Sequence, residues 1–485
     1  MTAIYSFIPN SAENEIKELI CELKNSVGLE KIVVNEALST EGQEKVKRFS
    51  FQDFTGTELL KRMAAESEGA DYLLVLTKET SVRLGQFALE RLVGVAEATG
   101  AGMVYSDYME VKEGKLSAHP VIDYQEGSLR DDFNFGPLVL YCAKAFREAV
   151  SEMTQVFSHA GFYYLRLKVS QKYEFVRVPE FLYTVDETDI RKSGQKLFDY
   201  VDPKNRQVQI EMEQAATEHL KNVGAWLKPE FSEVKFAEKE FATKASVIIP
   251  VLNREKTIAD AIQSVLDQKT NFPFNLLVVD NHSKDRTTEI IRSFSEKDGR
   301  VIHIIPERND LGIGGCWNAA VHDPRCGMFA VQLDSDDIYK DENTLQIMVD
   351  AFYRENCAMV VGTYQLVNFK LEEIPPGIID HREWTPDNGR NNALRINGLG
   401  APRAFYTPVL REVKIPNVSY GEDYAVGLAI SRQYRIGRVY ENVYLCRRWD
   451  DNSDAALDIE KMNKHNLYKD RVRTIELKAR QLKNK

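Results

Sequence analysis

Residues 245–250, with the sequence ASVIIP, are a short run rich in β-branched side chains that ends at a proline. Such a run predicts a buried β-strand. Apolar residues at helical spacing follow over about 256–267, and NLLVVD at 275–280 predicts a second buried strand that ends in a carboxylate. Alternating strands and helices predict an α/β fold, in which a mostly parallel sheet carries helices on both faces.

The alternation continues downstream. We expect a helix over about 285–294, a strand at 301–305 (VIHII), a short helix after the glycine-rich turn at 311–315 (LGIGG), and a strand at 328–333 (MFAVQL). The last strand runs straight into the acidic sequence DSDD at 334–337.

Ligands of open α/β sheets bind beyond the carboxyl ends of the strands. Residues 250–253, Asp280 and residues 334–337 all directly follow predicted strands. The fold prediction therefore places them together at one edge of the sheet.

The N-terminal half repeats this pattern in a weaker form. IYSFIP at 4–9 matches SVIIP at 246–250, and further matches follow in order at offsets that drift from about 240 to about 260 residues. Such a repeat predicts duplication of one fold unit, although unrelated α/β domains also share short strands of this kind. We expect two tandem Rossmann-like domains at 1–230 and 244–454, a linker over about 228–244, and a C-terminal helix at 455–485.

Length, charge and cysteine content exclude several classes of protein. A chain of 485 residues is long enough for two domains, and its net charge of -10 argues against binding to nucleic acid. We find neither a signal peptide nor an apolar run that could span a bilayer, and the six cysteines form no CxxC pair. A cytoplasmic protein with reduced thiols fits these features.

The acidic sequence DSDD is the first candidate for chemistry. In an extended segment alternate side chains face the same way, so Asp334 and Asp336 can point together into the crevice while Ser335 faces away. Two carboxylates at a strand end suit Mg²⁺ or Mn²⁺, which keep coordination positions open for phosphate oxygens and water. The alternative is that Asp336 or Asp337 caps a helix after Ile338.

Four motifs, by their order and spacing, resemble those of the inverting GT-A glycosyltransferases of family 2. They are SVIIPVLN at 246–253, LVVD at 277–280, the glycine-rich turn that leads to Asn318, and LDSDD at 333–337, within a region of resemblance at about 244–452. The resemblance implies a nucleotide-diphosphate sugar of the UDP or GDP type as donor, with Mn²⁺ or Mg²⁺ as cofactor. It further implies transfer to a hydroxyl of a glycan or lipid-linked acceptor, in glycan or polysaccharide biosynthesis.

The resemblance assigns roles to residues at the first two strand ends. It implies that Pro250, Val251 and Asn253 hold the nucleotide, and that Asp280 accepts a hydrogen bond from the base. The alternative for Asp280 is an ordinary turn or capping role.

The resemblance also covers the glycine-rich turn and the acidic sequence. Asn318 matches a family position near the nucleotide and metal, whereas Trp317 stands where the family often has arginine. Asp334 would face the ribose or a metal-bound water, and Asp336 would bind the metal directly. Two further residues complete the predicted donor site: Gly312 and Ser335.

The sequence YGEDYA at 420–425 matches the family's Glu-Asp pair at Glu422 and Asp423. Inverting transfer to a hydroxyl needs a general base opposite the leaving group, and a carboxylate at the start of a helix can serve. The resemblance implies Asp423 as the base and Glu422 as a supporting group at the acceptor site. The alternative is that both acids simply favour a helix N-terminus.

The sequence CRRW at 446–449 lies where many family members carry a basic or histidine-containing segment near the diphosphate. A guanidinium suits phosphate oxygens, so we expect Arg448 or its neighbour Arg447 to contact the diphosphate, surface arginines being the alternative. Trp449 stands near the position of the family's histidine, so the resemblance does not indicate which residue, if any, is a third metal ligand. The motif also resembles the Arg-Trp signature of processive polysaccharide synthases. Those enzymes carry membrane helices, whereas this sequence has no apolar run of that length, so we expect the addition of a single sugar.

The N-terminal half lacks these acids, and we therefore expect a degenerate, non-catalytic GT-A-like domain. It would bind acceptor, hold the enzyme domain or form a homodimer. Its acids at 106–107 and 131–132 are expected to be turn and surface residues. The replacements are Asn35 for Asp280, TKE at 77–79 for residues 334–336, and GFY at 161–163 for residues 421–423.

The sequence also predicts the structure of two further segments. The tail at 455–485, with nine Lys/Arg and four Asp/Glu, predicts a helix packed by Leu467, Ile475 and Leu482, and its basic character leaves open a peripheral contact with the inner face of a membrane. Residues 371–400 are expected to form a loop over the acceptor site, in which Trp384 stacks on a sugar or joins the core.

The leading hypothesis is thus a metal-dependent enzyme that transfers one sugar with inversion. The rival hypothesis is a non-catalytic scaffold or binding protein built from two transferase-like domains. The acids retained at Asp280, Asp334, Asp336 and Asp423 argue against the rival.

Overall fold

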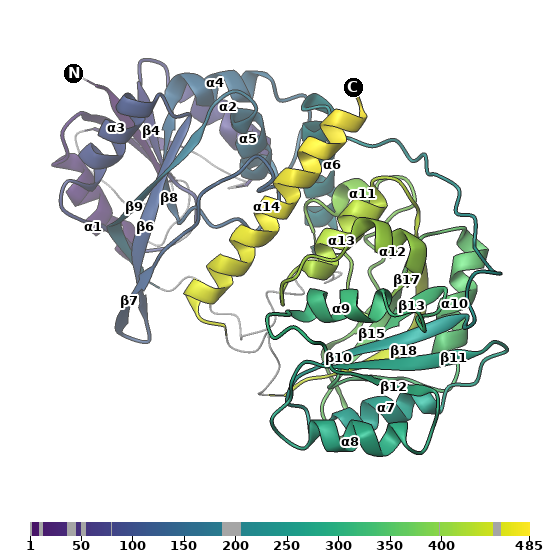
Figure 1. Cartoon of the computed structure of the whole chain (residues 1–485). Helices are drawn as coiled ribbons and strands as arrows, with labels where there is room; N and C mark the ends of the chain where they lie inside the picture. Colours follow the sequence, from purple (N-terminus) through teal and green to yellow (C-terminus); the bar gives the residue numbers. More distant parts are fainter. Residues whose placement is uncertain are drawn as a thin grey trace. The chain divides into compact units, whose positions relative to one another are not determined.

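The computed structural model describes residues 2–8, 13–35, 45–49, 55–78, 80–186, 205–396, 398–449 and 457–485. The chain forms two compact units, which Figure 1 colours by sequence. Unit 1 comprises Met1–Trp226 together with Leu457–Lys483, and unit 2 comprises Leu227–Ala456. Unit 2 is therefore inserted, along the chain, before the last helix of unit 1.

Unit 1 begins and ends with the chain. Its elements are β1 (Ile4–Ile8), α1 (Glu13–Lys24), β2 (Leu29–Asn35), β3 (Val46–Phe49), α2 (Thr57–Glu66), β4 (Tyr72–Leu76), β5 (Val82–Leu84), α3 (Ala88–Thr99), β6 (Met103–Lys112), β7 (Lys115–His119), β8 (Leu138–Cys142), α4 (Ala143–Ser151), α5 (Gly161–Ser170), β9 (Phe175–Asp186), α6 (Arg206–Asn222) and α14 (Ile459–Lys483).

The strands of unit 2 follow one another as in unit 1, but its helices α8 and α11 have no counterpart among the described residues of unit 1. Its elements are β10 (Ala245–Val251), α7 (Ile258–Leu266), β11 (Phe274–Asp280), α8 (Thr287–Ser295), β12 (Val301–Ile304), α9 (Ile313–Val321), β13 (Phe329–Gln332), β14 (Ile338–Tyr339), α10 (Thr344–Glu355), β15 (Met359–Val367), β16 (Glu373–Ile379), α11 (Gly389–Asn392), β17 (Arg403–Tyr406), α12 (Thr407–Val413), α13 (Glu422–Ser431) and β18 (Ile436–Arg447).

The two sheets have the same topology. In unit 1 the strand order is β3-β2-β1-β4-β8-β6-β9-β5, with β7 on β6, and in unit 2 it is β12-β11-β10-β13-β17-β15-β18-β14, with β16 on β15. Each described strand of one sheet thus has a counterpart at the same place in the other. The predicted α/β class and the predicted duplication are confirmed.

Each sheet is mixed, with a parallel half that positions the candidate site. In unit 2, β10 pairs in parallel with β11 and β13, and β11 with β12. Beyond β13 the sheet continues through β17, which is antiparallel to both β13 and β15. The carboxyl ends of β10, β11 and β13 therefore meet at one edge, as the sequence predicted.

The core of unit 2 forms because local periodicity matches the layers. All residues of β10 except Pro250 are buried, as expected for a strand covered on both faces. In α7, Ile258, Ala261, Ile262 and Val265 have no exposed surface, and their helical spacing places them on one face.

The segment expected to be a linker, about residues 228–244, is packed against unit 2, together with Leu227 before it. The N–H groups of Leu227 and Val234 donate to the side-chain oxygens of Asn391 and Asn356, at 3.0 and 2.9 Å. The Phe236 ring packs edge-on against the rings of Phe329, Phe352 and Tyr406 in the core. This segment is therefore part of unit 2.

The carboxyl end of β11 is fixed by Asp280, which has no exposed surface. Its Oδ1 accepts the N–H of Ser283 at 2.9 Å, and its Oδ2 accepts the hydroxyl of Thr288, in α8, at 2.5 Å. The Nε2 of His303, in β12, lies 3.5 Å from the same Oδ2. Burial opposes ionisation, but His303, Thr288 and Ser283 outweigh it and hold the pKa of Asp280 well below its usual range.

Helix α14 is an integral part of unit 1 and buries four charged side chains together with one leucine, Leu477. Asp470, Arg473, Glu476 and Arg480 are all at most 3% exposed. Asp470 accepts the Ser128 hydroxyl at 3.0 Å and pairs with Arg473 at 2.9 Å.

The predicted packing of this helix is wrong at two positions. Ile475 is 68% exposed and Leu482 is 73% exposed, whereas Leu467 packs against the core of unit 1. The buried face of α14 carries mainly charged residues, which find polar partners in unit 1, and this face leaves Ile475 and Leu482 outside.

Two further findings concern the whole described chain. All six cysteines are free thiols. Among the described residues, no helix combines the length and the apolar character needed to cross a membrane.

We predict that Gly127→Ala destabilises unit 1. The N–H of Gly127 donates to the Thr474 hydroxyl at 3.0 Å, and a Cβ at Gly127 would lie 2.1 Å from the backbone nitrogen of Thr474 in α14. Because backbone cannot yield as a flexible side chain can, we expect a loss of about 1–3 kcal/mol in the free energy of unfolding. Urea unfolding and hydrogen exchange of α14 amides measure it.

The control for this variant is Gly94→Ala, where an added Cβ meets nothing within 4 Å. That change should be neutral or slightly stabilising, because alanine favours a helix interior. Equal urea midpoints and equal exchange rates in α14 for both variants would contradict the packing described for Gly127.

We predict that Asp280→Asn reduces stability in a pH-dependent way. The pKa in the fold lies below the unfolded value of about 3.9, so the carboxylate stabilises the fold above about pH 4 and this stabilisation disappears as the pH falls. At pH 7 the variant should lose about 1–3 kcal/mol of unfolding free energy, and near pH 2 much less. Urea unfolding without nucleotide, across this pH range, measures the difference.

The control is Asp310→Asn, which removes an exposed ion pair with Arg308. Solvent screens such a pair, so little change is expected at any pH. A loss of stability in Asp280→Asn that is independent of pH would refute the role given to its ionised carboxylate.

Candidate functional site

The acidic sequence after β13 forms a turn at the carboxyl edge of the sheet, in which the N–H of Asp337 donates to the Asp334 carbonyl at 3.2 Å, so the expected extended conformation is wrong. Strand β14 begins at Ile338, and the next helix, α10, begins only at Thr344. The alternative in which Asp336 or Asp337 caps a helix after Ile338 is therefore wrong. The acids require another explanation.

Asp334 is held from two sides. Its Oδ1 accepts the Nε2 of Gln332 at 2.9 Å, and its backbone N–H donates to the Tyr444 hydroxyl at 3.1 Å. Burial raises the pKa of Asp334, and the charges of Asp336 and Asp423 raise it further, against the opposing effect of Arg403. These acids therefore lie close enough to repel one another.

Asp336 faces an aromatic ring and a guanidinium. Its Oδ2 accepts the indole N–H of Trp449 at 3.3 Å, and the Nε of Arg254 lies 3.9 Å from the same oxygen. The Arg254 guanidinium also lies over the Trp449 ring, 5.8 Å from its centroid. Asp336 thus has a cation and an indole beside it, at the place where the family resemblance suggested histidine.

Asp423 and Glu422 form the first turn of α13. The Oδ1 of Asp423 accepts the N–H of Tyr424 at 2.6 Å, and its Oδ2 accepts the Nη1 of Arg403. Burial, and then the charge of Asp423, raise the pKa of Glu422 to about 8. Its carboxyl group is therefore mainly protonated at neutral pH.

Arg403, on β17, is the buried cation among these acids, with 8% of its surface exposed. Besides Asp423, its Nη1 donates to the Leu399 carbonyl at 3.2 Å, and its Nε donates to the Oε1 of Gln332 at 3.0 Å. Burial opposes its charge, but Asp423, Asp334 and Glu422 outweigh this effect and raise its pKa. The residue joins the segment of Asp334 to the segment of Asp423.

Hydrogen bonds join the turn after β10 to the loop after β11. The N–H of Asn253 donates to the Ser283 hydroxyl at 3.0 Å, and the Oδ1 of Asn253 accepts the N–H of Lys284 at 2.8 Å. The carbonyl of Val251 accepts the N–H of Asn281 at 2.8 Å. Pro250, Val251, Asn253 and Asp280 are thus brought together, with Asn253 exposed and Asp280 buried beneath the loop.

The glycine-rich turn packs against the segment that precedes α13. The N–H of Gly312 donates to the Asn417 Oδ1 at 2.8 Å, and a Cβ at Gly314 would lie 1.9 Å from the Pro416 carbonyl oxygen. Both amide atoms of Asn318 bind the backbone of Ile415, at 2.6 and 3.1 Å. These contacts give the turn a structural role, and its predicted contact with a nucleotide stays a prediction.

The two arginines after β18 differ in their surroundings. Arg447 is 3% exposed, its Nε donates to the Asp336 carbonyl at 2.5 Å, and its Nη1 pairs with Asp260 at 2.8 Å. Arg448 is half-buried, and its backbone N–H donates to the Val367 carbonyl at 2.8 Å. Arg447 therefore supports the backbone of the acidic sequence, and Arg448 retains the predicted diphosphate role.

Trp384, in the segment expected to cover the acceptor site, belongs to the core. It is 8% exposed, and the Arg438 guanidinium lies 4.2 Å from its ring centroid. His381, in the same segment, is buried and pairs with Glu383 at 3.1 Å. Of the two alternatives for Trp384, the core role is the one observed.

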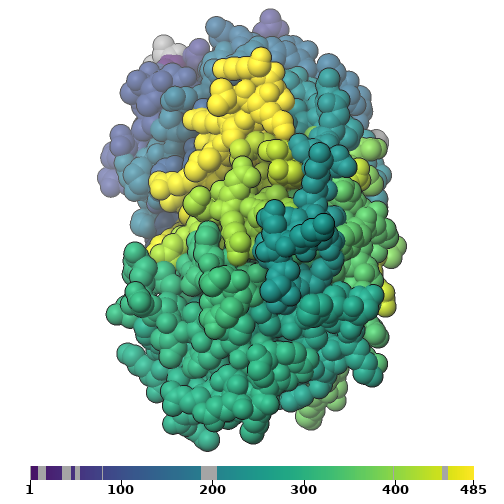
Figure 2. Space-filling view, turned by 45° about the vertical axis from the view of Figure 1, so that its right-hand side comes forward, coloured from purple at the N-terminus to yellow at the C-terminus, as the bar shows by residue number. Residues whose placement is uncertain are grey.

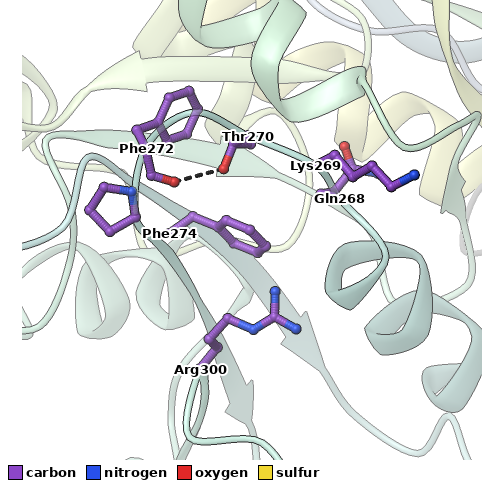
Figure 3. Close-up of a pocket in the computed structure, with 7 residues that line it drawn as sticks. Gln268, Lys269, Thr270, Phe272, Phe274 and Arg300 are labelled. Atoms are coloured by element: carbon purple, nitrogen blue, oxygen red, sulfur yellow. Dashed lines mark hydrogen bonds between the residues drawn. The ribbon is translucent and has the colours of Figure 1, made fainter.

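Hollows in unit 2 lie at both ends of its strands. Figure 3 shows one of about 540 Å³ at the starts of β11 and β12, lined by Gln268, Lys269, Thr270, Phe272, Pro273, Phe274 and Arg300. It lies at the opposite edge from the acids. A second hollow of about 460 Å³ between α7 and β14 includes Asp260 and Arg447, and therefore adjoins the acidic sequence.

Among the residues that the structure describes, the corresponding positions of unit 1 carry no such cluster. Strand β4 is followed by Thr77 and Lys78, and α5 begins with Gly161. The described residues do not include Glu79, 9–12 or 36–44. Asp107 is used in a bidentate pair with Arg177, at 2.8 and 2.7 Å.

The acids of unit 2 fit a divalent cation of the kind that uses few protein ligands. In the part of the chain that the structure describes, no three His, Cys, Asp or Glu side chains form a ready-made metal site. Asp334 and Asp336 offer two carboxylates, and the buried Oε2 of Glu422 has no hydrogen-bond partner among the described residues. Burial is the main cause of the raised pKa values of Asp334 and Glu422, and the charges of neighbouring acids add to it. Mg²⁺ or Mn²⁺ could complete its shell with phosphate oxygens and water.

Four of the contacting residues were not anticipated from the sequence: Arg254, Gln332, Arg403 and Tyr444. Arg254 directly follows the motif at 246–253, so its position in a strand-end turn was an available signal. Gln332 and Arg403 lie inside strands, where polar residues break the apolar pattern, and that break was the signal for them.

Comparison with known proteins identifies the family. The family model "Glycosyl transferase family 2" matches residues 246–411. TuaG of Bacillus subtilis, a glycosyltransferase assigned by its name to teichuronic acid biosynthesis, is 30% identical over 189 residues, which are 39% of this chain and 72% of TuaG. The glucosyltransferase WfgD of Escherichia coli is 35% identical over 123 residues, 25% of this chain and 46% of WfgD.

A solved structure is also similar. Staphylococcus aureus TarS 1-349 in complex with UDP-GlcNAc matches 50% of this chain and 73% of its own, with 22% identity and a TM-score of 0.38. The chain spans 32%, 46% and 32% of the first three curated relatives that it matches. Because TuaG is matched over more than two thirds of its length, and the matched region contains the acidic strand ends, this chain belongs to glycosyltransferase family 2.

Proposed function

We propose that unit 2 transfers one sugar, with inversion, from a nucleotide-diphosphate sugar to an acceptor hydroxyl. One observation carries the proposal: acids from two separate segments, Asp334 from one and the pair 422–423 from the other, converge on Arg403 at the carboxyl edge of the sheet. Family membership supports the same reaction class.

The donor would bind across the ends of β10, β11 and β13. Asn253 is exposed beside the loop over Asp280, which suits a nucleoside. Asp280 itself has no exposed surface and supports that loop from beneath, so its contact with the base stays a prediction. Arg254 lies 3.9 Å from Asp336, so its guanidinium can reach phosphate oxygens near the acids. Arg448 is the second candidate for the diphosphate. The names of the relatives do not determine whether the donor of this chain carries UDP or GDP.

Asp336, with Asp334, would hold Mn²⁺ or Mg²⁺. A divalent cation there supplies Lewis-acid stabilisation of the negative charge on the departing nucleoside diphosphate. Asp334 retains the alternative of facing the ribose, since Gln332 already occupies its Oδ1.

Asp423 would act as the general base. Its side chain is 32% exposed, whereas both of its oxygens are oriented by Tyr424 and Arg403. The acceptor hydroxyl gives its proton to the Asp423 carboxylate, and its oxygen forms the new bond to the anomeric carbon. The bond from that carbon to the phosphate oxygen breaks, and its electron pair leaves with the nucleoside diphosphate.

Glu422 would contact the acceptor. Its pKa of about 8 keeps the carboxyl group protonated at neutral pH, so it can donate a hydrogen bond to a sugar oxygen. A glycan or lipid-linked glycan, in polysaccharide biosynthesis, is the acceptor class that we propose.

Calorimetric titration with UDP and GDP, with and without Mn²⁺, and release of nucleoside diphosphate from a panel of donors test this function. We expect metal-dependent binding of one nucleotide by the wild type. Asp336→Ala should lose it with the fold kept, because a metal carboxylate is gone. Asp423→Asn should bind donor normally but lose at least about 100-fold in transfer, because the base is absent.

Asp350→Ala, an exposed acid on α10, is the matched control and should behave as wild type. Absence of metal-dependent binding by either nucleotide would favour the non-catalytic scaffold. Full transfer activity in Asp423→Asn would remove Asp423 as the base.

We also propose that α14 contacts an anionic membrane from the cytoplasm. Its acids Asp470 and Glu476 are buried and its third acid, Glu460, lies in the first turn, so the exposed stripe from Lys464 to Leu482 contains basic but no acidic side chains of the helix. Figure 2 shows α14, in yellow, at the surface. The stripe pairs cations with exposed apolar side chains, a combination that suits an anionic bilayer surface; it consists of Lys464, Arg471, Ile475, Lys478 and Leu482.

Sedimentation with vesicles tests this contact. The wild type should bind vesicles containing phosphatidylglycerol, but not vesicles of phosphatidylcholine alone, and lose binding in high salt. Arg471→Glu with Lys478→Glu should weaken binding at least about tenfold, since each basic residue near the surface contributes about 1 kcal/mol. Lys144→Glu with Lys239→Glu, two exposed lysines elsewhere, is the control. Equal binding by both double variants would refute the assignment of this stripe.

A further inference from the structure

A continuous chain of hydrogen bonds links the predicted donor and acceptor halves of the site. It runs from Asp334 Oδ1 through the Gln332 amide and the Arg403 guanidinium to Asp423 Oδ2. The backbone N–H of Arg403 also donates to the Gln332 Oε1, at 3.2 Å. Both linking residues are buried, at 5% and 8% exposure.

The duplicated fold shows that the sheet itself does not need this bridge. Strands β4 and β8 of unit 1 correspond to β13 and β17: Tyr72 pairs with Cys142 as Phe329 pairs with Tyr406, and α4 and α12 each start directly after the second residue of the pair. Counting along the strands, the places of Gln332 and Arg403 are taken in unit 1 by Val75 and Val139.

Val75 and Val139 pair directly in the register of β4 and β8, and both are buried. An apolar pair thus closes the same sheet in the unit that has Thr77 instead of Asp334 and Tyr163 instead of Asp423. A buried guanidinium carries a desolvation cost that an apolar pair avoids. Gln332 and Arg403 therefore occur in the unit that has the acids, and the unit without the acids forms the same fold without them.

We propose that Arg403 is a positioning residue for the base Asp423, and that Gln332 holds Arg403 in register with the donor-side carboxylate Asp334. The inference rests on the proposed function, in which Asp423 takes the acceptor proton. Arg403 does not touch the reacting atoms. It fixes one oxygen of Asp423 while the N–H of Tyr424 fixes the other, so the carboxylate presents a single orientation.

Lysine cannot replace arginine here. The guanidinium uses two nitrogens in a planar fork, Nε toward Gln332 and Nη1 toward Asp423 and Leu399. An ammonium group keeps the charge but is a single point donor on a flexible stem. Misplacement of a catalytic group by about 1 Å can cost about 100-fold in rate.

The test compares Arg403→Lys and Arg403→Ala with the wild type. Turnover is release of nucleoside diphosphate from UDP-glucose, UDP-N-acetylglucosamine or GDP-mannose, whichever the wild type uses fastest, and binding is calorimetry with the matching nucleotide and Mn²⁺. We expect kcat to fall about 10-fold or more in Arg403→Lys and about 100-fold in Arg403→Ala, with nucleotide Kd and donor KM changed less than about threefold. Added methylguanidinium should raise the kcat of Arg403→Ala at least about tenfold.

Arg390→Lys is the matched control, since Arg390 is 4% exposed and its guanidinium donates to the carbonyls of Ser431 and Glu230. It should keep the wild-type kcat and show no response to methylguanidinium. Near-normal kcat in Arg403→Lys, or loss of kcat in Arg403→Ala without methylguanidinium rescue, would overturn the positioning role. Lack of turnover by the wild type with every donor would overturn the proposed function itself, and this inference with it.

Discussion

Repulsion between neighbouring carboxyl groups is the constraint on which the site in unit 2 depends. The charges of neighbouring acids add to the effect of burial in raising the pKa values of Asp334 and Glu422, and the buried Arg403 lies beside them. At low dielectric, neither the acids nor the guanidinium would be tolerated alone. The arrangement leaves an excess of negative charge, which is the property that a divalent cation and the tail of a sugar donor would use.

The two units show how one fold supports two different interiors. They share strand order and register, yet a valine pair in unit 1 occupies the place of Gln332 and Arg403 in unit 2. The acids disappear together with the cation that accompanies them. Fold and site are therefore separable here: apolar pairing is sufficient to close the sheet, and the polar bridge serves the chemistry at its edge.

Helix α14 and residues 228–244 show where local patterns mislead. A helix with scattered leucines and isoleucines predicts an apolar buried face, but Asp470 and Arg473 are buried because unit 1 offers Ser128 and other polar partners. A charged segment with little regular structure predicts a linker, but Phe236 anchors it to the core of unit 2. In both cases the partner lies far away in the sequence, where no local pattern can report it.

The sequence by itself determined the α/β class, the duplication, and the strand ends that carry Asp280, Asp334 and Asp336, because hydrophobic periodicity and strand-end position are local properties of the chain. It also identified Glu422 and Asp423 through their match to a family motif. Only the tertiary structure decided that Asp280 is buried beneath a loop, that Asn318 binds Ile415, and that Gln332 and Arg403 connect the acids. Those facts depend on contacts between residues many positions apart, and such contacts exist only once the strands have paired.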